Sequence, residues 1–425
     1  MTRGARSLFI RPAVATSSDS TKPRSPLGLI FLTILIDMIG FGIVIPVLPV
    51  YAEGSRFGAT PTQLSLLVGI YSLLQLVFSP VLGHLSDRIG RKPVLTVSIL
   101  GTAIGFFVTG AAGAYWMLLL GRIIDGVSGG NIATGMACIA DVTTKENRSK
   151  SMGLIGAAFG VGFMIGPALG GVLGKISPAL PFFVAGGLAL VNCALVAMNL
   201  PETLTPEAQE RARHRASIGE VFSHGRSGLI LAILASQLAS VTGFSIMTSL
   251  FALFCEKRFG YDIAHTGWIL FYVGFLGVLM QGGVLRRLLK RPIEKQLAVV
   301  GAGVLALSMY FLPSTPPSLG MLMLVCAGIS VGNSFVTPTM NGLASRSSDA
   351  HTQGRVLGLL ASAGSLGRFV GPMIGFQLLR FDTDAQYART SFYASAAILI
   401  LALVCITMVS PGAATAPTPD AIPET

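Results

Sequence analysis

Apolar runs of about twenty residues, separated by short polar stretches, dominate the chain. They cover 27–50, 63–82, 94–112, 116–140, 151–174, 181–200, 227–254, 266–285, 297–313, 319–344, 356–379 and 391–409. A helix of about twenty residues is long enough to cross the ~30 Å hydrocarbon core of a bilayer. The pattern therefore predicts an all-α membrane protein with twelve transmembrane helices.

The second half of this pattern repeats the first about two hundred residues later. The polar turn GHLSDRIGRKP at 83–93 aligns with GGVLRRLLKRP at 282–292, and the apolar segment 151–170 aligns with 356–375. Two parallel copies of one membrane unit are typical of transporters whose binding site lies between the halves. We therefore expect two pseudo-symmetric six-helix bundles.

The boundaries of the repeat define the predicted domains. Residues 27–200 and 227–409 form the two bundles, and the polar, charged segment 201–226 joins them in the cytoplasm. The basic, Ser/Pro-rich stretch 1–26 and the Ala/Pro/Thr-rich stretch 410–425 are expected to be disordered tails. An Arg/Ser-rich, acid-poor N-terminus is also typical of a transit peptide, and this alternative stays open.

Composition and charge narrow the function classes. The chain is 52% hydrophobic and only 12% charged, whereas roughly a quarter of the residues in soluble domains are charged. A net charge of +11 is compatible with nucleic-acid binding, but 22 of the 30 Lys and Arg residues fall in segments that the topology places in the cytoplasm. This is the positive-inside bias of a membrane protein with both termini inside. We therefore expect a multi-pass protein of the bacterial inner membrane and no nucleic-acid partner.

Motifs for nucleotide, metal or covalent chemistry are missing from the sequence. Gly174-Lys175 is followed by Ile176, which excludes a Walker loop, and neither H-E-x-x-H nor a nucleophile elbow occurs. The five cysteines lack the spacing of a zinc site or a disulfide framework. We expect no enzyme activity, no cofactor and no nucleotide as the energy source.

Asp37 is a carboxylate about ten residues into the first predicted helix. A rise of 1.5 Å per residue places it ~15 Å deep, near the centre of the bilayer. Because an ionised carboxylate there costs at least ~2.5 kcal/mol, Asp37 should face a cavity or a polar partner. It is either a group that takes up and releases a proton as access alternates, or an acid permanently paired with an arginine or a helix dipole.

Arg122 and Asp125 are three residues apart in the fourth predicted helix, which places them on one face. They form either a local ion pair that lowers the cost of insertion, or a proton-linked pair in which Arg122 changes partner when Asp125 or Asp37 is protonated. Both interpretations stay open.

The fifth predicted helix carries a stripe of small residues around one proline: Gly162, Gly166, Pro167, Gly170 and Gly171. Such a stripe lets helices touch backbone to backbone, and the proline bends the helix. It is either a static packing surface or a sliding contact between the halves.

The polar turn after the second helix contains Gly83, Asp87, Arg88, Gly90, Arg91 and Lys92. Its basic residues help to set the topology, and Gly90 permits a tight turn. Asp87 is also placed to meet the positive end of the helix that begins near Val356. We expect such a contact to close the cytoplasmic side. Weaker candidates for a cavity lining are Gln237, Asn333, Asn341 and Arg368; for the three amides, hydrogen bonding between helices explains the pattern equally well.

These motifs resemble those of a known family. The turn GHLSDRIGRKPVL (83–95) is similar to the loop 2–3 signature of the major facilitator superfamily. DMIGFGIVIPVLP (37–49), GRIIDGVSGG (121–130) and GAAFGVGFMIGPALGG (156–171) resemble the first-, fourth- and fifth-helix signatures of its twelve-helix drug:proton antiporters. The first half of the chain is most similar to the tetracycline exporter group.

The resemblance implies that Asp37 and Arg122 lie in the proton and substrate pathway, and that Asp87 with Arg91 forms a cytoplasmic gate. Gly105 stands where tetracycline exporters carry an acid in the third helix, and the ninth helix lacks their second acid. The resemblance therefore does not extend to the residues expected for a metal–tetracycline substrate. Proton coupling would then depend on Asp37 and on Asp125, an acid that the exporter group lacks.

Together, the residues and the resemblance predict a monomeric proton-coupled antiporter that exports small organic or drug-like molecules by alternating access. Its partners would be the substrate, protons and the lipid bilayer. Two alternatives stay open: a metabolite uptake carrier of the same fold, and a membrane sensor or scaffold that transports nothing.

Overall fold

The computed structural model describes residues 26–143, 145–205, 227–289, 293–348 and 352–409. Within these ranges every regular element is a helix, and twelve helical segments are long and apolar enough to cross a membrane. The prediction of twelve transmembrane helices is confirmed. The predicted tails before Pro26 and after Val409, and the linker from 206 to 226, lie outside the described residues.

The first half of the chain forms six spans from seven helices. They are α1 (Pro26–Glu53), α2 (Pro61–Ile89), α3 (Arg91–Gly110), α4 (Tyr115–Ser128), α5 (Asn131–Val142), α6 (Lys145–Ile176) and α7 (Leu180–Asn199). The fourth span is divided into α4 and α5, because the backbone leaves the helical conformation at Gly129 and Gly130. This break lies inside the membrane and is important for the site described below.

The second half forms the other six spans. Its long helices are α10 (Ser227–Phe259), α11 (Ile263–Leu279), α13 (Glu294–Phe311), α14 (Leu319–Arg346), α15 (Gln353–Leu378) and α16 (Arg389–Met408). The eighth span continues from α11 through the π-helix η1 (Met280–Leu285) into α12 (Arg286–Leu288). Three short 3-10 turns complete this half. After α13 comes η2 (Leu312–Ser314), after α15 comes η3 (Leu379–Phe381), and before α16 comes η4 (Asp384–Gln386).

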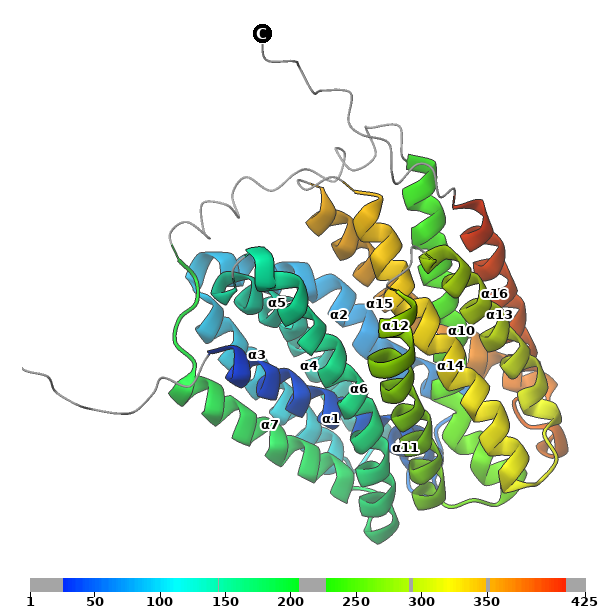
Figure 1. The fold of residues 1–425 in the computed structure, drawn as a ribbon. Helices are drawn as coiled ribbons and strands as arrows, with labels where there is room; N and C mark the ends of the chain where they lie inside the picture. The colour runs from blue at the N-terminus through cyan, green and yellow to red at the C-terminus, as the bar shows by residue number, and fades with distance from the viewer. Residues whose placement is uncertain (1–25, 144, 206–226, 290–292, 349–351, 410–425) are drawn as a thin grey trace, which may run out of the picture.

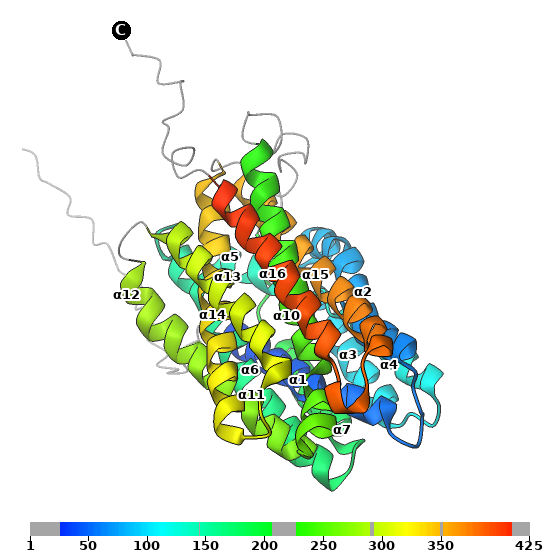
Figure 2. The same ribbon diagram turned by 90° about the vertical axis from the view of Figure 1, so that its right-hand side faces the viewer.

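The two halves repeat one packing scheme, as the sequence repeat predicts. In the first half α1 packs on α6 and α3 packs on α4 and α7; in the second half α10 packs on α15 and α13 packs on α14 and α16. The halves meet chiefly along two equivalent contacts, α2 against α15 and α6 against α11, and α1 also touches α10 and α11. Figure 1 shows the first half, in blue to green (α1 to α7), beside the second half, in bright green to red (α10 to α16), and Figure 2 turns α16 and α10 of the second half toward the viewer.

Each bundle has two ends, which we name by the segments they carry. The basic end carries the turn at Gly90 and residues 201–205, and it is the end that the sequence predicts to face the cytoplasm. The far end carries residues 54–60 and 260–262. One apolar core includes residues of both halves, among them Phe182 of α7 and Phe254 of α10. The basic end of the second half has a separate core around Ile233 and Met340. The apolar core therefore joins the halves toward the far end.

Candidate functional site

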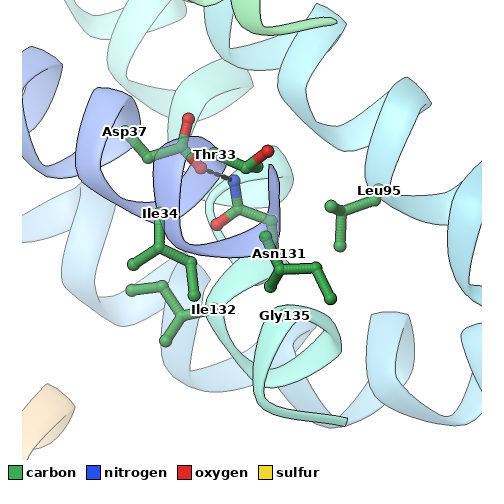
Figure 3. A pocket seen from close by; sticks show the side chains of 8 residues that line it. Thr33, Ile34, Asp37, Leu95, Asn131, Ile132 and Gly135 are labelled. Carbon is green, nitrogen blue, oxygen red and sulfur yellow. Dashed lines mark hydrogen bonds between the residues drawn. The ribbon is translucent and has the colours of Figure 1, made fainter. Parts of the chain in front are cut away.

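Asp37 lies inside the first half, where two asparagine side chains hold its carboxylate. Asn131 Nδ2 donates to Asp37 Oδ2 at 2.6 Å, as Figure 3 shows, and Asn192 Nδ2 donates to Asp37 Oδ1 at 3.0 Å. Asn192 Nδ2 also lies 3.1 Å from the carbonyl oxygen of Thr33. Among the described residues, no lysine or arginine forms an ion pair with Asp37. The carboxylate is therefore solvated by amides from α5 and α7 and not by a cation.

Asn131 reaches Asp37 because the fourth span breaks just before it. A Cβ at Gly129 would lie 2.8 Å from Tyr71 Oη, and a Cβ at Gly130 would lie 2.9 Å from Ser79 Cα, so α2 requires both residues to be glycine. The break frees the carbonyl oxygen of Gly129, which accepts a 2.9 Å hydrogen bond from Gln75 Nε2. Buried backbone groups that leave a helix need such a partner. The break restarts the helix at Asn131 and turns its side chain toward α1.

Arg122 and Asp125 form a buried ion pair one turn from this break. Arg122 NH1 lies 2.7 Å from Asp125 Oδ2, and the guanidinium lies over the ring of Tyr71, 4.5 Å from its centroid. The predicted proximity of the pair is confirmed; whether the pair responds to a proton stays a prediction. Asp125 and Asp37 both line one small pocket, together with Tyr71, Phe106 and other residues of α1 to α5.

A second polar cluster lies where α15 meets α2. Arg368 NH2 donates to Ser365 Oγ at 2.9 Å and to Gln75 Oε1 across the halves at 3.3 Å. Gln237 of α10 is buried close by: a Cβ on Gly364 would lie 3.6 Å from Gln237 Nε2 and 3.7 Å from Arg368 NH1. The structure thus brings together two of the four weaker candidates.

The other two weaker candidates lie apart from this cluster, on α14. Asn341 is exposed and donates to the carbonyl oxygen of Thr337, one turn earlier in its own helix. Asn333 is half-buried, and its side chain forms no hydrogen bond with another described residue.

The turn at the basic end is organised by the guanidinium of Arg91, which is 2% exposed. Arg91 NH1 lies 2.5 Å from Asp87 Oδ1, its Nε lies 3.0 Å from Asp141 Oδ2 of α5, and it also donates to Ser86 Oγ. The turn residue Gly90 has a backbone φ of +110°, which residues with a side chain rarely adopt. Among the other basic residues of the motif, Arg88 is exposed and Lys92 is half-buried. These contacts tie the end of α2 to the end of α5 within the first half.

Sequence reasoning missed Glu202, which holds the start of α3. Its carboxylate accepts hydrogen bonds from the backbone N–H of Arg91 at 2.9 Å and of Lys92 at 3.2 Å, and from two further N–H groups in its own segment. A carboxylate at the positive end of a helix is favourable, and it satisfies N–H groups without an intrahelical partner. The beginning of the linker is therefore fastened to the polar turn.

The stripe on α6 packs against two different helices. Gly162, Gly166 and Gly170 lie against Met38, Gly42 and Ile43 of α1, and a Cβ on Gly166 would come within 2.6 Å of Gly42 Cα. Pro167 and Gly171 also meet the other half: a Cβ on Gly171 would lie 2.5 Å from the carbonyl oxygen of Ile263 of α11. The stripe is thus a packing surface within the half and a contact surface between halves.

The contacts between halves lie toward the far end in both equivalent interfaces. Positions whose Cβ would touch the other half are Gly69 on α2, Gly160 and Gly171 on α6, and Gly267 and Gly274 on α11. Nearer the basic end, an added Cβ would have no described atom within 4 Å. This holds for Gly83, Gly156, Gly282 and Gly283. Three polar pairs add to the far-end contact: Lys175 with Asp262, Lys257 with Glu53, and Gln377 with Thr62. The helices therefore pack closely at the far end and diverge toward the basic end.

Comparison with known proteins identifies what this arrangement resembles. A family model described as Major Facilitator Superfamily matches residues 30–372. The chain is 30% identical to the class D tetracycline resistance protein of Salmonella ordonez, over 91% of this chain and 98% of that protein. It is also 30% identical to multidrug resistance protein 1 of Bacillus subtilis (strain 168), over 86% of this chain and 92% of that protein.

Among solved structures, the fold is similar to a bacterial homolog of the human lysosomal transporter Spinster. The TM-score is 0.72 at 14% sequence identity, and the match covers 90% of this chain and 96% of that one. At this identity the likeness concerns the fold alone.

Proposed function

Because the chain belongs to the major facilitator superfamily, we propose that it is a proton-coupled antiporter that exports small organic, drug-like molecules. The family makes it a multi-pass membrane transporter and not an enzyme. Its relatives are named for resistance to tetracycline and to multiple drugs. The observation that carries the proposal is a buried carboxylate, Asp37, whose described partners are neutral amides.

The surroundings of Asp37 suit a group that exchanges a proton. Burial disfavours the ionised carboxylate, while two amide N–H donors stabilise it, so the two forms are closer in free energy than for an acid fixed by an arginine. Asn192 Oδ1 is buried without a hydrogen-bond partner among the described residues. It belongs to the same amide whose Nδ2 donates to Asp37, and we propose that it accepts the O–H of the protonated form. Asp37 would then have hydrogen-bond partners in both states.

Alternating access is supported by the two equivalent interfaces between halves. In each, glycines toward the far end touch the other half and glycines toward the basic end do not. Two similar bundles that touch at one end can rock about their central contacts and close the other end. We propose that this conformation is open to the cytoplasm, with Asp87, Arg91 and Asp141 belonging to the gate that closes in the opposite state.

The test replaces Asp37 with asparagine in purified protein reconstituted into vesicles. Asp37→Asn keeps the size of the side chain but cannot carry a proton, so efflux driven by a pH gradient should fall to background. Exchange of labelled for unlabelled substrate, which needs no net proton movement, should persist. Asp384→Asn, at an exposed acid outside the site, serves as the control. Unchanged pH-driven efflux in Asp37→Asn would contradict the proposal.

The direction of transport requires a separate arm of the same experiment. Vesicles are prepared with the pH gradient in either orientation, and substrate accumulation is followed in each. An exporter of the proposed kind accumulates substrate against the proton flow, whereas an uptake carrier coupled to protons accumulates it along that flow.

A further inference from the structure

Arg368 is an arginine inside the membrane that has no acidic partner among the described residues. Its NH2 group contacts only neutral oxygens, Ser365 Oγ and Gln75 Oε1, and its NH1 group makes no hydrogen bond with a described residue. Arg122, by contrast, is neutralised by Asp125 at 2.7 Å. A cation in the interior of a membrane protein is costly unless something compensates it. Arg368 therefore retains an unmatched positive charge.

The side chains around Arg368 offer further polar groups to the same small region. Gln237 from α10 and Arg368 from α15 both lie within 4 Å of the point where a Cβ on Gly364 would stand. Ser365 and Gln75 complete the group, and Gln75 and Gln237 are each less than a tenth exposed. A glycine at 364 leaves space between a guanidinium and an amide, both of which can donate. This is the composition of a site for an oxyanion.

The cluster also lies where a molecule entering from the basic end would meet it. On its far side α15 is closed against α2: a Cβ on Gly69 would lie 3.1 Å from the ring of Phe369, and Gln377 bonds to Thr62. On the other side, about four helical turns from Gly69, Gly83 meets no described atom of the second half. Arg368 thus stands at the inner limit of the closed contact.

We propose that Arg368, assisted by Gln237 and Ser365, binds an acidic group of the transported molecule, a carboxylate, sulfonate or phosphate. This inference rests on the proposed function and names a substrate class for it: small organic acids. The planar guanidinium matches the geometry of two oxyanion oxygens and forms stronger hydrogen bonds to them than to a neutral amide oxygen. An acidic substrate therefore replaces the 3.3 Å contact to Gln75.

Replacement of that contact has a consequence for the rest of the protein. Gln75 connects Arg368 to the carbonyl oxygen of Gly129, at the break of the fourth span, and Asn131 two residues later holds Asp37. Substrate binding at Arg368 is thereby linked through one side chain and the helix break to the carboxylate proposed to carry the proton. No direct contact between substrate and Asp37 is required.

The experiment measures ligand binding to the purified full-length protein in detergent by thermal stabilisation. The probes are three carboxylates of increasing size (benzoate, 2-naphthoate and 1-pyrenebutyrate), their methyl esters, and 2-naphthylmethylammonium. We expect at least one acid to bind more tightly than its ester by roughly 10- to 100-fold, the range for a charge-assisted hydrogen bond. Arg368→Gln should abolish this difference, and Arg368→Lys should retain part of it. Arg380→Gln removes an exposed arginine at the far end of the same span and should bind as the wild type does.

Several outcomes would overturn the inference. One is that the wild type binds none of the acids more tightly than its ester. Another is that Arg368→Gln still binds the acid more tightly than the ester. If Arg368→Gln does not fold, Ser365→Ala and Gln237→Leu must each weaken acid binding several-fold. Stabilisation by phosphatidylglycerol alone, without competition by any soluble acid, would assign the cluster to a lipid headgroup and overturn it as well.

Failure of the inference is distinguishable from failure of the proposed function. Asp37→Asn leaves Arg368, Gln237 and Ser365 in place, so it should still prefer the acid over its ester while it loses pH-driven transport. If wild-type vesicles show no pH-driven transport of any probe, the antiport proposal fails even where acid binding depends on Arg368. If pH-driven transport is present but insensitive to Arg368→Gln for acidic probes, the substrate class alone is wrong.

Discussion

Asn131 donates a 2.6 Å hydrogen bond to Asp37 from the first residue of α5, where the fourth span restarts after its break. The two residues are 94 positions apart in sequence. The contact makes the geometry of the Gly129-Gly130 break part of the environment of the carboxylate.

The first prediction removes this donor. Asn131→Ala leaves the ionised form of Asp37 with one amide donor fewer, a loss of about 1.5–3 kcal/mol for a hydrogen bond to a charged group. Because the lost donor stabilises chiefly the ionised form, the pH at which transport is half-maximal should move upward by about one to two units. The measurement is the rate of substrate exchange across a series of symmetric pH values. Asn341→Ala, which removes an exposed amide bonded to its own helix, should leave the profile unchanged.

The second prediction concerns the glycines of α6. Gly171→Val places a side chain against the backbone of Ile263, so the far-end contact between halves cannot form as it does here. Transport should be lost, and a cysteine introduced at the far end of α2, such as Thr62→Cys, should become more reactive toward a thiol reagent. Gly156→Val on the same helix meets no described neighbour and should transport normally. Equal loss in both variants would indicate that a general requirement for helix flexibility, and not the contact, explains the effect.

The sequence was sufficient for the features that depend on local patterns. Runs of apolar residues fixed the twelve spans, and a spacing of three residues correctly placed Arg122 beside Asp125. The internal repeat anticipated the equivalent packing of the two halves. Each of these features depends on helix geometry, which is the same in every helix.

Contacts between distant helices could not be derived in this way. Asn192 and Glu202 lie 155 and 111 residues from Asp37 and Arg91, the groups that they hold, and the registers of the packed helices decide whether they meet. Single polar residues are common in membrane helices, so an isolated asparagine carries little information. Only Asn131 had a local signal, because the Gly-Gly pair before it is a typical place for a helix to break.

The third prediction concerns Asp262, outside the membrane-spanning segments. Its carboxylate accepts a hydrogen bond from the backbone N–H of His265 and lies 3.1 Å from Lys175 of the other half; the first of these contacts is the main cause that lowers its pKa below the ordinary 3.8. An acid whose pKa is lowered by folding stabilises the folded protein at any pH above its ordinary pKa. This contribution is lost as the pH falls from the ordinary pKa through the lowered pKa. Asp262→Asn should therefore unfold at a slightly lower temperature than the wild type at pH 7. The difference should shrink once the pH falls below 3.8, and a constant difference would contradict the assignment.

The fourth prediction tests Glu202 as the cap of α3. Glu202→Ala removes the acceptor for the N–H groups of Arg91 and Lys92, and the loss of a helix cap costs about 0.5–2 kcal/mol. The melting temperature should fall, and proteolysis near the polar turn should become faster because the start of α3 is no longer fastened to the linker. Glu202→Gln retains an acceptor oxygen and should recover part of the loss. Glu256→Ala, at an exposed acid near the far end, is the matched control. If Glu202→Ala melts at the same temperature as this control, the N–H groups of Arg91 and Lys92 must find another acceptor, and Glu202 is not the cap of α3.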